Sequence, residues 1–145
     1  VERIAWLEDL NVKRYKIASR SIHEEHLINA VTETGKPVLI SLGMWKQETF
    51  PSYSGNISYL YCISKYPTPL KELDFSKIDF SSYGGFSDHT EGVVAPITAL
   101  ARGAKIIEKH FTIDKTMHGP DHSGSMTPEE LTEICNYRDS LKECM

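Results

Sequence analysis

Five short apolar runs recur along this chain at a nearly constant interval, and each run ends in a polar residue. The runs are residues 15–18, 38–40, 59–63, a short one near Phe86, and 106–107. The polar residues that close them are Ser19, Ser41, Ser64, Ser87 and His110, at spacings of 22, 23, 23 and 23 residues. Runs of this kind predict β-strands, and the stretches between them are long enough for helices. The pattern therefore predicts repeated β/α units and a parallel sheet.

The positions of the polar residues indicate which kind of parallel sheet to expect. Parallel sheets keep their chemistry at the carboxyl ends of the strands, which is where these polar residues fall. Five units ending in this way predict an arc of a (β/α)8 barrel. A closed barrel takes roughly 250 residues, or about 200 at the compact end, whereas this chain has 145. The predicted fold class is therefore α/β, a partial TIM barrel.

The segments between the runs carry helix signals. Helices are expected at residues 22–34, 47–57, 70–78 and 90–102, and another at the N-terminus is expected to lead into the first strand. Gly35 and Gly103 lie where glycines commonly end helices. Near the C-terminus, Thr127 is expected to cap a helix whose capping box Glu130 completes. That last helix has one mostly apolar face.

Two histidines, His89 and His110, each lie just past an apolar run, with a helix-like segment between them. The right-handed connection of a β/α/β unit brings both to the same edge of the sheet, where neighbouring strands lie about 4.8 Å apart. Two imidazoles at that separation can bind one metal ion, each through a nitrogen at about 2.1 Å. Alternation places Ser87 on the face of His89 and Glu108 on the face of His110. The alternative is that each histidine is a hydrogen-bonded structural residue at a strand end.

Composition and charge exclude several other classes of protein. A net charge of -4 gives no reason to expect a nucleic acid or an anionic membrane as partner. No apolar run approaches 18 residues and the start is not signal-like, so we expect neither membrane insertion nor export, and a cytoplasmic location. Cys62, Cys135 and Cys144 lack the spacing of a metal site and are expected to be reduced thiols.

Six stretches, taken in order, resemble the signature motifs of the sialic acid synthase family. They are YKIAS at 15–19, GKPVLISLGM at 35–44, CISKYPTP at 62–69, GFSDHTEG at 85–92, IIEKHFTID at 106–114 and GPDHSGSMTPEEL at 119–131. The resemblance spans nearly the whole chain, and the order SDHT, IEKHF, GPDH at this spacing is highly specific. It implies that residues 1–145 are the C-terminal portion of a synthase barrel, about strands 4 to 8. The N-terminal strands and the family's small antifreeze-like domain would then be absent.

The resemblance also implies an activity and roles for individual residues. Family members condense phosphoenolpyruvate with an N-acetylated hexosamine to give a nonulosonic (sialic-type) acid and phosphate. His89 and His110 would bind a divalent metal ion, typically Mn²⁺, with Mg²⁺ or Co²⁺ as alternatives. Glu108 would lie near the metal and move a proton or position a water. The residues expected at phosphoenolpyruvate are Lys16, Ser19, Ser41, Ser64 and Ser87, and those expected at the amino sugar are Tyr66 and Asp121. The full-length protein is expected to be a homodimer.

Some of these residues also have plainer interpretations. On residue type alone, the favoured interpretation of Lys16 is a solvated charge beside a strand, and that of Ser41 is a turn residue. The remaining histidines are expected on the surface or in loops. Among them only His122, beside Asp121, is a candidate for the site.

One pair of residues departs from the family motif. After KIAS many members carry Gly-Glu, whose Glu contacts the acetamido sugar, whereas this chain has Arg20 and Ser21. The acceptor sugar therefore stays open, and a legionaminic- or pseudaminic-type product is as compatible as N-acetylneuraminate. One alternative is a phosphoenolpyruvate-dependent synthase with a phosphorylated sugar acceptor, which would suit Arg20. The other is a non-catalytic barrel fragment. Even if the complete protein is a synthase, the isolated fragment is expected to be inactive.

Overall fold

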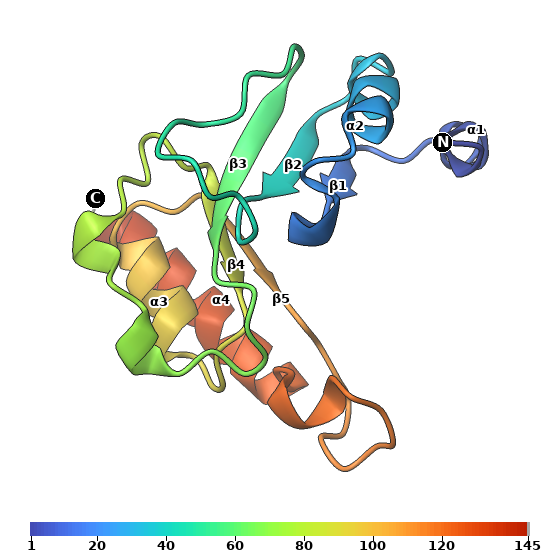
Figure 1. Ribbon diagram of the computed structural model, residues 1–145. Coiled ribbons are helices and arrows are strands. Elements are labelled where there is room, and N and C mark those ends of the chain that lie inside the picture. Colours follow the sequence, from blue (N-terminus) through green and yellow to red (C-terminus); the bar gives the residue numbers. More distant parts are fainter. Residues whose placement is uncertain (145) are drawn as a thin grey trace.

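The computed structural model describes residues 1–144, and its centre is a five-stranded parallel sheet (Figure 1). The strands are β1 (Tyr15–Ile17), β2 (Val38–Ser41), β3 (Ile57–Cys62), β4 (Gly85–Asp88) and β5 (Ile106–Lys109). They lie side by side in chain order, and every neighbouring pair is parallel. Consecutive parallel strands without a change of order form the arc of a (β/α)8 barrel. The predicted fold class is confirmed.

Side-chain alternation gives the sheet two different faces. On the outer face, apolar residues such as Ile17, Val38 and Ile40 are buried in a core beneath the helices. On the inner face, the residues near the carboxyl ends are polar. The β4–β5 register, for example, places Ser87 beside Glu108. The strands therefore hold an apolar core on one face and present polar side chains on the other.

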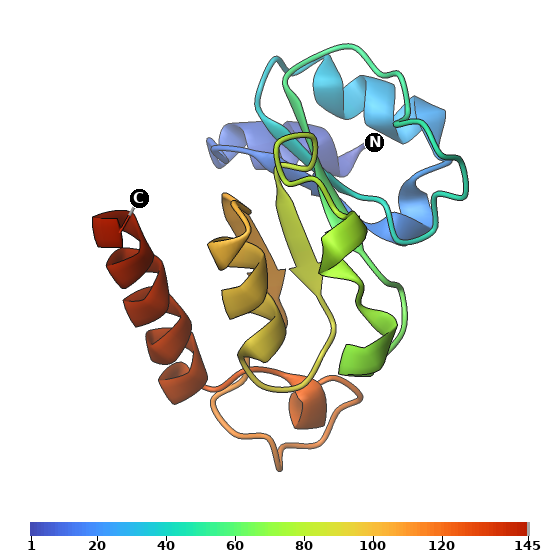
Figure 2. The ribbon, with the colours of Figure 1, turned by 90° about the vertical axis from the view of Figure 1, so that its left-hand side faces the viewer.

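The described residues form four α-helices, and all but the first cover the outer face of the sheet. They are α1 (Arg3–Asp9), α2 (Glu25–Thr32), α3 (Val94–Ala101) and α4 (Pro128–Cys144). Buried Ile28 and Val31 of α2 pack in the core over β1 and β2. Ala95 and Ala99 of α3 pack in a second core with Phe86 of β4, and α4 runs alongside α3 (Figure 2).

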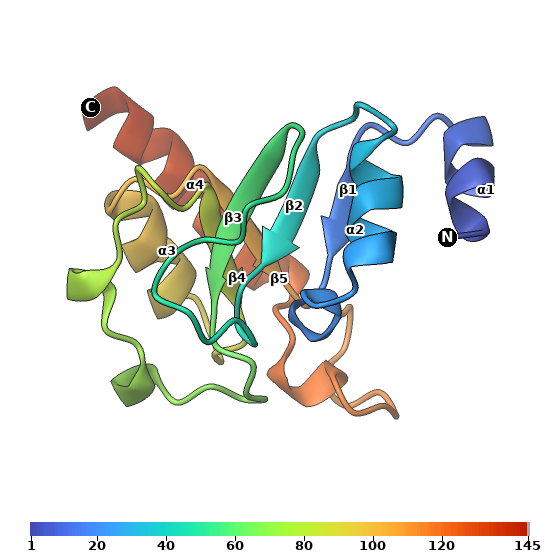
Figure 3. The ribbon, with the colours of Figure 1, turned by 45° about the horizontal axis from the view of Figure 1, so that its top comes forward.

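Helix α1 lies beyond the edge of the sheet, next to β1 (Figure 3). None of its residues is buried. Its main link to the sheet is Glu8, which accepts a hydrogen bond from the Tyr15 hydroxyl and pairs with Lys36 at 2.9 Å. The expected N-terminal helix is thus present, but it contributes little to the core.

Gly85, the first residue of β4, sets how closely β4 and β5 can approach. A Cβ atom there would lie 2.0 Å from the backbone oxygen of Ile106. No side chain fits at that distance, so glycine is required for these two strands to pair in this register.

The helix expected at residues 47–57 is wrong. The structure has an irregular loop there, followed by β3 from Ile57. Pro51 lies in the middle of the segment, and proline both lacks an amide hydrogen and disfavours helical backbone in the residue before it. Gly55 adopts a positive φ of 118°. Aromatic contacts order the loop instead, since Phe50 stacks on Tyr59 with 5.3 Å between ring centres.

Other expected elements are present with different bounds. The segment 70–78 forms two short 3₁₀ turns, Leu70–Glu72 and Phe75–Lys77, rather than one helix. Helix α3 begins at Val94 because Gly92, with φ 71°, precedes it in a non-helical conformation.

The start of the last helix, α4, agrees with expectation, and so do the cysteines. The capping box of α4 is confirmed, because the Thr127 amide donates to Glu130 Oε2 at 2.8 Å and the Glu130 amide to Thr127 Oγ1 at 3.3 Å. The cysteines are free, and Cys62 is buried. Within residues 1–144, no helix combines the length and the apolar character needed to cross a membrane.

Candidate active site

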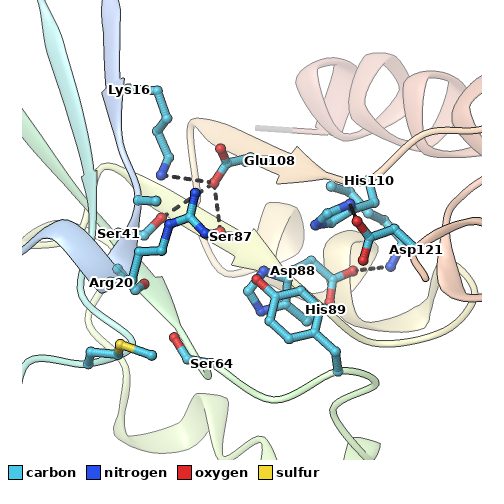
Figure 4. Close-up of a pocket in the computed structure, with 15 residues that line it drawn as sticks. Lys16, Arg20, Ser41, Ser64, Ser87, Asp88, His89, Glu108, His110 and Asp121 are labelled. Carbon is cyan, nitrogen blue, oxygen red and sulfur yellow. Dashed lines mark hydrogen bonds and ion pairs between the residues drawn. The ribbon is translucent and has the colours of Figure 1, made fainter. Parts of the chain in front are cut away.

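An open cavity of about 800 Å³ lies at the carboxyl ends of the strands (Figure 4). Every side chain that the sequence predicts for the site lines it: Lys16, Ser19, Ser41, Ser64, Tyr66, Ser87, His89, Glu108, His110 and Asp121. Because all strands point the same way, the residues that follow them meet at one edge of the sheet. The structure thus brings together residues that the sequence spreads over most of its length.

Three donors from three different strands converge on one carboxylate oxygen. Ser87 Oγ donates to Glu108 Oε2 at 2.6 Å, and Ser41 Oγ donates to the same oxygen at 3.3 Å. Lys16 Nζ lies 3.3 Å from that oxygen. We call Lys16, Ser41 and Ser87 the donor cluster. Such a cluster suits a single anionic group, and here the Glu108 carboxylate fills it.

Glu108 therefore lies against residues that the sequence assigns to substrate binding. Among residues 1–144, its hydrogen bonds come from Ser41 and Ser87 and none comes from a histidine. The register explains this, because Ser87 is the direct β4 partner of Glu108 on the inner face.

Ser19 and Ser64, which also line the cavity, lie close to Gly43. Ser19 Oγ accepts a hydrogen bond from the Gly43 amide at 3.0 Å and donates to Cys62 Sγ at 3.5 Å. A Cβ atom on Gly43 would lie 2.4 Å from Ser64 Oγ and 2.9 Å from Cys62 Sγ. Glycine is therefore needed for the loop after β2 to approach these side chains.

Cys62 is a neighbour of the site that the sequence reading placed only in a strand. Its Sγ lies 3.9 Å from His89 Nδ1. Burial raises the pKa of the Cys62 thiol, but the contacts with His89 and Ser19 more than offset it, so the pKa lies below its ordinary value. Burial likewise lowers the pKa of His89, and the contacts with Cys62 and the Ile63 carbonyl outweigh it, so that pKa lies above its ordinary value.

The two histidines lie close together beside Tyr66. The ring centres of His89 and His110 are 5.9 Å apart, and the Tyr66 ring packs 4.0 Å from His89 and 5.8 Å from His110. His89 Nδ1 lies 2.8 Å from the carbonyl oxygen of Ile63. A carbonyl only accepts, so Nδ1 carries a proton and Nε2 is left free when the ring is neutral.

This donor set fits a divalent metal ion. A shared ion about 2.1 Å from one nitrogen of each ring is compatible with ring centres 5.9 Å apart. The hydrogen bond from His89 Nδ1 to a carbonyl is the kind of contact that orients metal-binding imidazoles. Residues 1–144 hold no group of three or more His, Cys, Asp or Glu side chains placed to share an ion.

The residues expected at the sugar lie at the more exposed side of the cavity. Asp121 Oδ2 lies 3.8 Å from His110 Nδ1, and Tyr66 precedes a cis bond to Pro67. Arg20 extends into the cavity toward the donor cluster (Figure 4). Its guanidinium makes no ion pair within residues 1–144. His122 is not among the residues that line the cavity, and its Nδ1 lies 2.8 Å from Thr112 Oγ1.

The sequence reading missed a buried ion pair beneath the histidines. Lys109 Nζ lies 2.7 Å from Asp88 Oδ2, and the side chains are 1% and 0% exposed. The sequence does carry a sign of this pair. On the outer face of β4 the apolar Phe86 is followed by the charged Asp88, and on the outer face of β5 the apolar Ile107 is followed by the charged Lys109.

Fold and site together define a protein of the (β/α)8-barrel class with a polar site at the carboxyl ends of its strands. The NeuB family model matches residues 1–145, and the chain belongs to the NeuB family. This confirms the resemblance seen in the sequence motifs.

Individual relatives agree with that assignment. The N,N'-diacetyllegionaminic acid synthase of Campylobacter jejuni is 31% identical over 160 residues, which cover 100% of this chain and 48% of the relative. The human N-acetylneuraminate-9-phosphate synthase is 32% identical over 146 residues, 90% of this chain and 40% of the relative. The crystal structure of the sialic acid synthetase from Leptospira borgpetersenii, in complex with citrate, matches with a TM-score of 0.85 and 29% identity, over 99% of this chain and 55% of that one. The chain thus spans less than half the length of the two relatives.

Proposed function

We propose that this chain is part of a metal-dependent synthase that condenses phosphoenolpyruvate with an N-acetylated hexosamine, giving a nonulosonic acid and phosphate. The observation that carries the proposal is the donor cluster, which binds one carboxylate oxygen in the same cavity as two adjacent histidines. The relatives named above support it, since their names are those of synthases of N,N'-diacetyllegionaminic acid and of N-acetylneuraminate 9-phosphate.

In this proposal the donor cluster binds an anionic group of phosphoenolpyruvate. Lys16 supplies a positive charge, and the hydroxyls of Ser41 and Ser87 supply short hydrogen bonds. The substrate anion must displace the Glu108 carboxylate, because two anions on the same donors repel each other. The displaced Glu108 would then be free to move a proton or to orient the water that adds at C2 before phosphate leaves.

The histidine side of the cavity is proposed to bind the sugar aldehyde. His89 and His110 would hold a divalent ion, which would supply a Lewis acid for the aldehyde oxygen of the sugar. Asp121 would accept hydrogen bonds from sugar hydroxyls, and the Tyr66 ring would hold His89 in place. The cavity, at about 800 Å³, is large enough for two small substrates held in contact.

A phosphorylated sugar acceptor is the second candidate, and Arg20 is the observation that favours it. Arg20 reaches into the cavity without a carboxylate partner in the part of the chain that the structure describes. An unpaired guanidinium suits a phosphate group on the acceptor. The human relative is named for a 9-phosphate product.

The test is phosphate release from phosphoenolpyruvate by the complete protein, with Mn²⁺ and a panel of free and phosphorylated N-acetylated hexosamines. We expect release that requires both the sugar and the metal, and a nonulosonic acid in the product mixture by mass spectrometry. Turnover only with phosphorylated sugars would select the second candidate. Release of phosphate without a new carbon–carbon bond would contradict both.

Two further expectations belong to the same proposal, a cytoplasmic location and a homodimer of the full-length protein. Cell fractionation and the mass of the complete protein in solution would test them.

A further inference from the structure

The ion pair of Lys109 and Asp88 lies one position before each of the two histidines, and both residues border the cavity although their side chains are 1% and 0% exposed. Asp88 is the last residue of β4, Lys109 is the last residue of β5, and the two are partners in the parallel register. His89 follows Asp88 and His110 follows Lys109. The pair therefore joins the two strands at the last position before each histidine.

The contacts of the pair also fix the backbone that carries His89. Asp88 Oδ1 accepts a hydrogen bond from the Thr90 amide at 2.8 Å, and Asp88 Oδ2 lies 2.7 Å from Lys109 Nζ. Lys109 Nζ also donates to the Thr90 carbonyl oxygen. Both backbone groups of Thr90 are thus tied to the pair, and His89 lies between the two tied residues.

Stability alone does not account for burying these two charges. Their side chains are 1% and 0% exposed. Taking both ions out of water is costly, and apolar residues of similar size in place of such a pair often leave stability unchanged or raise it. In some proteins a buried polar or ionic group selects one arrangement of the chain over others. Here the pair joins the ends of the two strands that carry the histidines.

We propose that the Lys109–Asp88 ion pair is a positioning device that sets the separation and orientation of His89 and His110 for binding one divalent ion. The inference rests on the proposed function, because it takes the two histidines as the metal ligands. Neither Lys109 nor Asp88 touches the ion or the substrates in this account. They act through the strand ends and through Thr90.

The experiment uses the complete protein and compares Asp88→Asn, Lys109→Met and the double variant. Asp88→Asn keeps the acceptor for the Thr90 amide and removes the charge, and Lys109→Met keeps most of the side-chain volume. Each single variant leaves one buried charge unpaired and should lower the unfolding temperature. The double variant leaves none and should recover most of that loss. In all three we expect Mn²⁺ affinity, measured by calorimetry, to fall about tenfold or more, with a changed electron paramagnetic resonance spectrum of bound Mn²⁺.

The double variant separates positioning from stability. Weak Mn²⁺ binding in a double variant of near-normal unfolding temperature supports the inference, and unchanged Mn²⁺ affinity in that variant overturns it. Lys77→Met is the matched control, since Lys77 pairs with Asp74 at 2.8 Å while 81% exposed. It should change neither quantity.

His89→Ala and His110→Ala serve as reference variants. If they lose Mn²⁺ binding and the pair variants do not, only the positioning inference fails. If they bind Mn²⁺ like the unchanged protein, the metal site of the proposed function is wrong, and the inference fails with it.

Discussion

Lys16 is the only lysine of the donor cluster, and its substitution tests whether the cluster binds the substrate anion. Lys16→Ala in the complete protein should weaken phosphoenolpyruvate binding by about 2 kcal/mol, the range for a hydrogen bond to a charged group, or roughly 30-fold in Kd. Calorimetric titration measures this directly. Lys36→Ala is the matched control, because Lys36 forms an ion pair of similar exposure with Glu8 outside the cavity. Equal phosphoenolpyruvate affinity with and without Lys16 would remove the donor cluster from substrate binding.

Arg20 and Ser21 are expected to set the choice of acceptor. Ser21 is shorter than the family Glu and uncharged, so an acetamido group must be held differently or the sugar must be different. Replacing both residues, Arg20→Gly with Ser21→Glu, should raise kcat/KM for N-acetylmannosamine at least tenfold relative to the other sugars of the panel, which is about 1.4 kcal/mol. A clear preference of the unchanged protein for N-acetylmannosamine would show that these two residues do not alter specificity.

At the scale of elements, the pairing of β4 with β5 depends on Gly85. In Gly85→Ala the new Cβ would meet a backbone oxygen at 2.0 Å, which no side-chain rotation relieves, so the strands must separate. We expect a loss of about 3 kcal/mol or more in the free energy of unfolding, measured by urea denaturation of the complete protein. Gly124→Ala is the control, because nothing lies within 4 Å of a Cβ there. A Gly85→Ala protein of unchanged stability would mean that the two strands are not packed this closely.

The strands were predictable from the sequence because each is signalled locally, by an apolar run and the polar residue that closes it. The same signal gives the direction of the strands, and so the edge where His89, His110 and the serines meet. Loops carry no such signal. Residues 47–57 read as a weak helix, although Pro51 and the aromatic contacts of Phe50 make an irregular loop.

Side-chain partners were the least predictable part of the site. The β4–β5 register and burial decide that Glu108 fills the donor cluster and that Lys109 reaches Asp88. Neither is visible in residues taken one strand at a time. The pattern of strand ends singled out the histidines and the serines, the family motif implied their roles, and only the structure supplied their contacts.

The whole molecule has apolar surface at both ends of its sheet. Within the described residues, β1 and β5 each pair on one side only. Trp6 and Leu10 near β1 are 65% and 76% exposed, and Ile113 after β5 is 75% exposed. Unpaired strand edges and exposed apolar side chains favour association with another chain segment. This chain spans less than half of each of the two relatives, so each of them has further sequence outside the matched part.

Residues 1–145 expressed alone are therefore expected to associate and not to catalyse the proposed reaction. The physical reason is that both edges of the sheet and its inner face stay open, so the donor cluster and the histidines have no wall opposite them to exclude water or to hold a second substrate. The measurements are the mass in solution by light scattering and the rate of phosphate release from phosphoenolpyruvate with the sugar panel, beside the complete protein under the same conditions. Weak Mn²⁺ binding should survive, because His89 and His110 are both present. A well-folded monomer of these residues that turns over at about 1 per second or faster, a rate typical of enzymes, would show that the partial barrel is sufficient for catalysis.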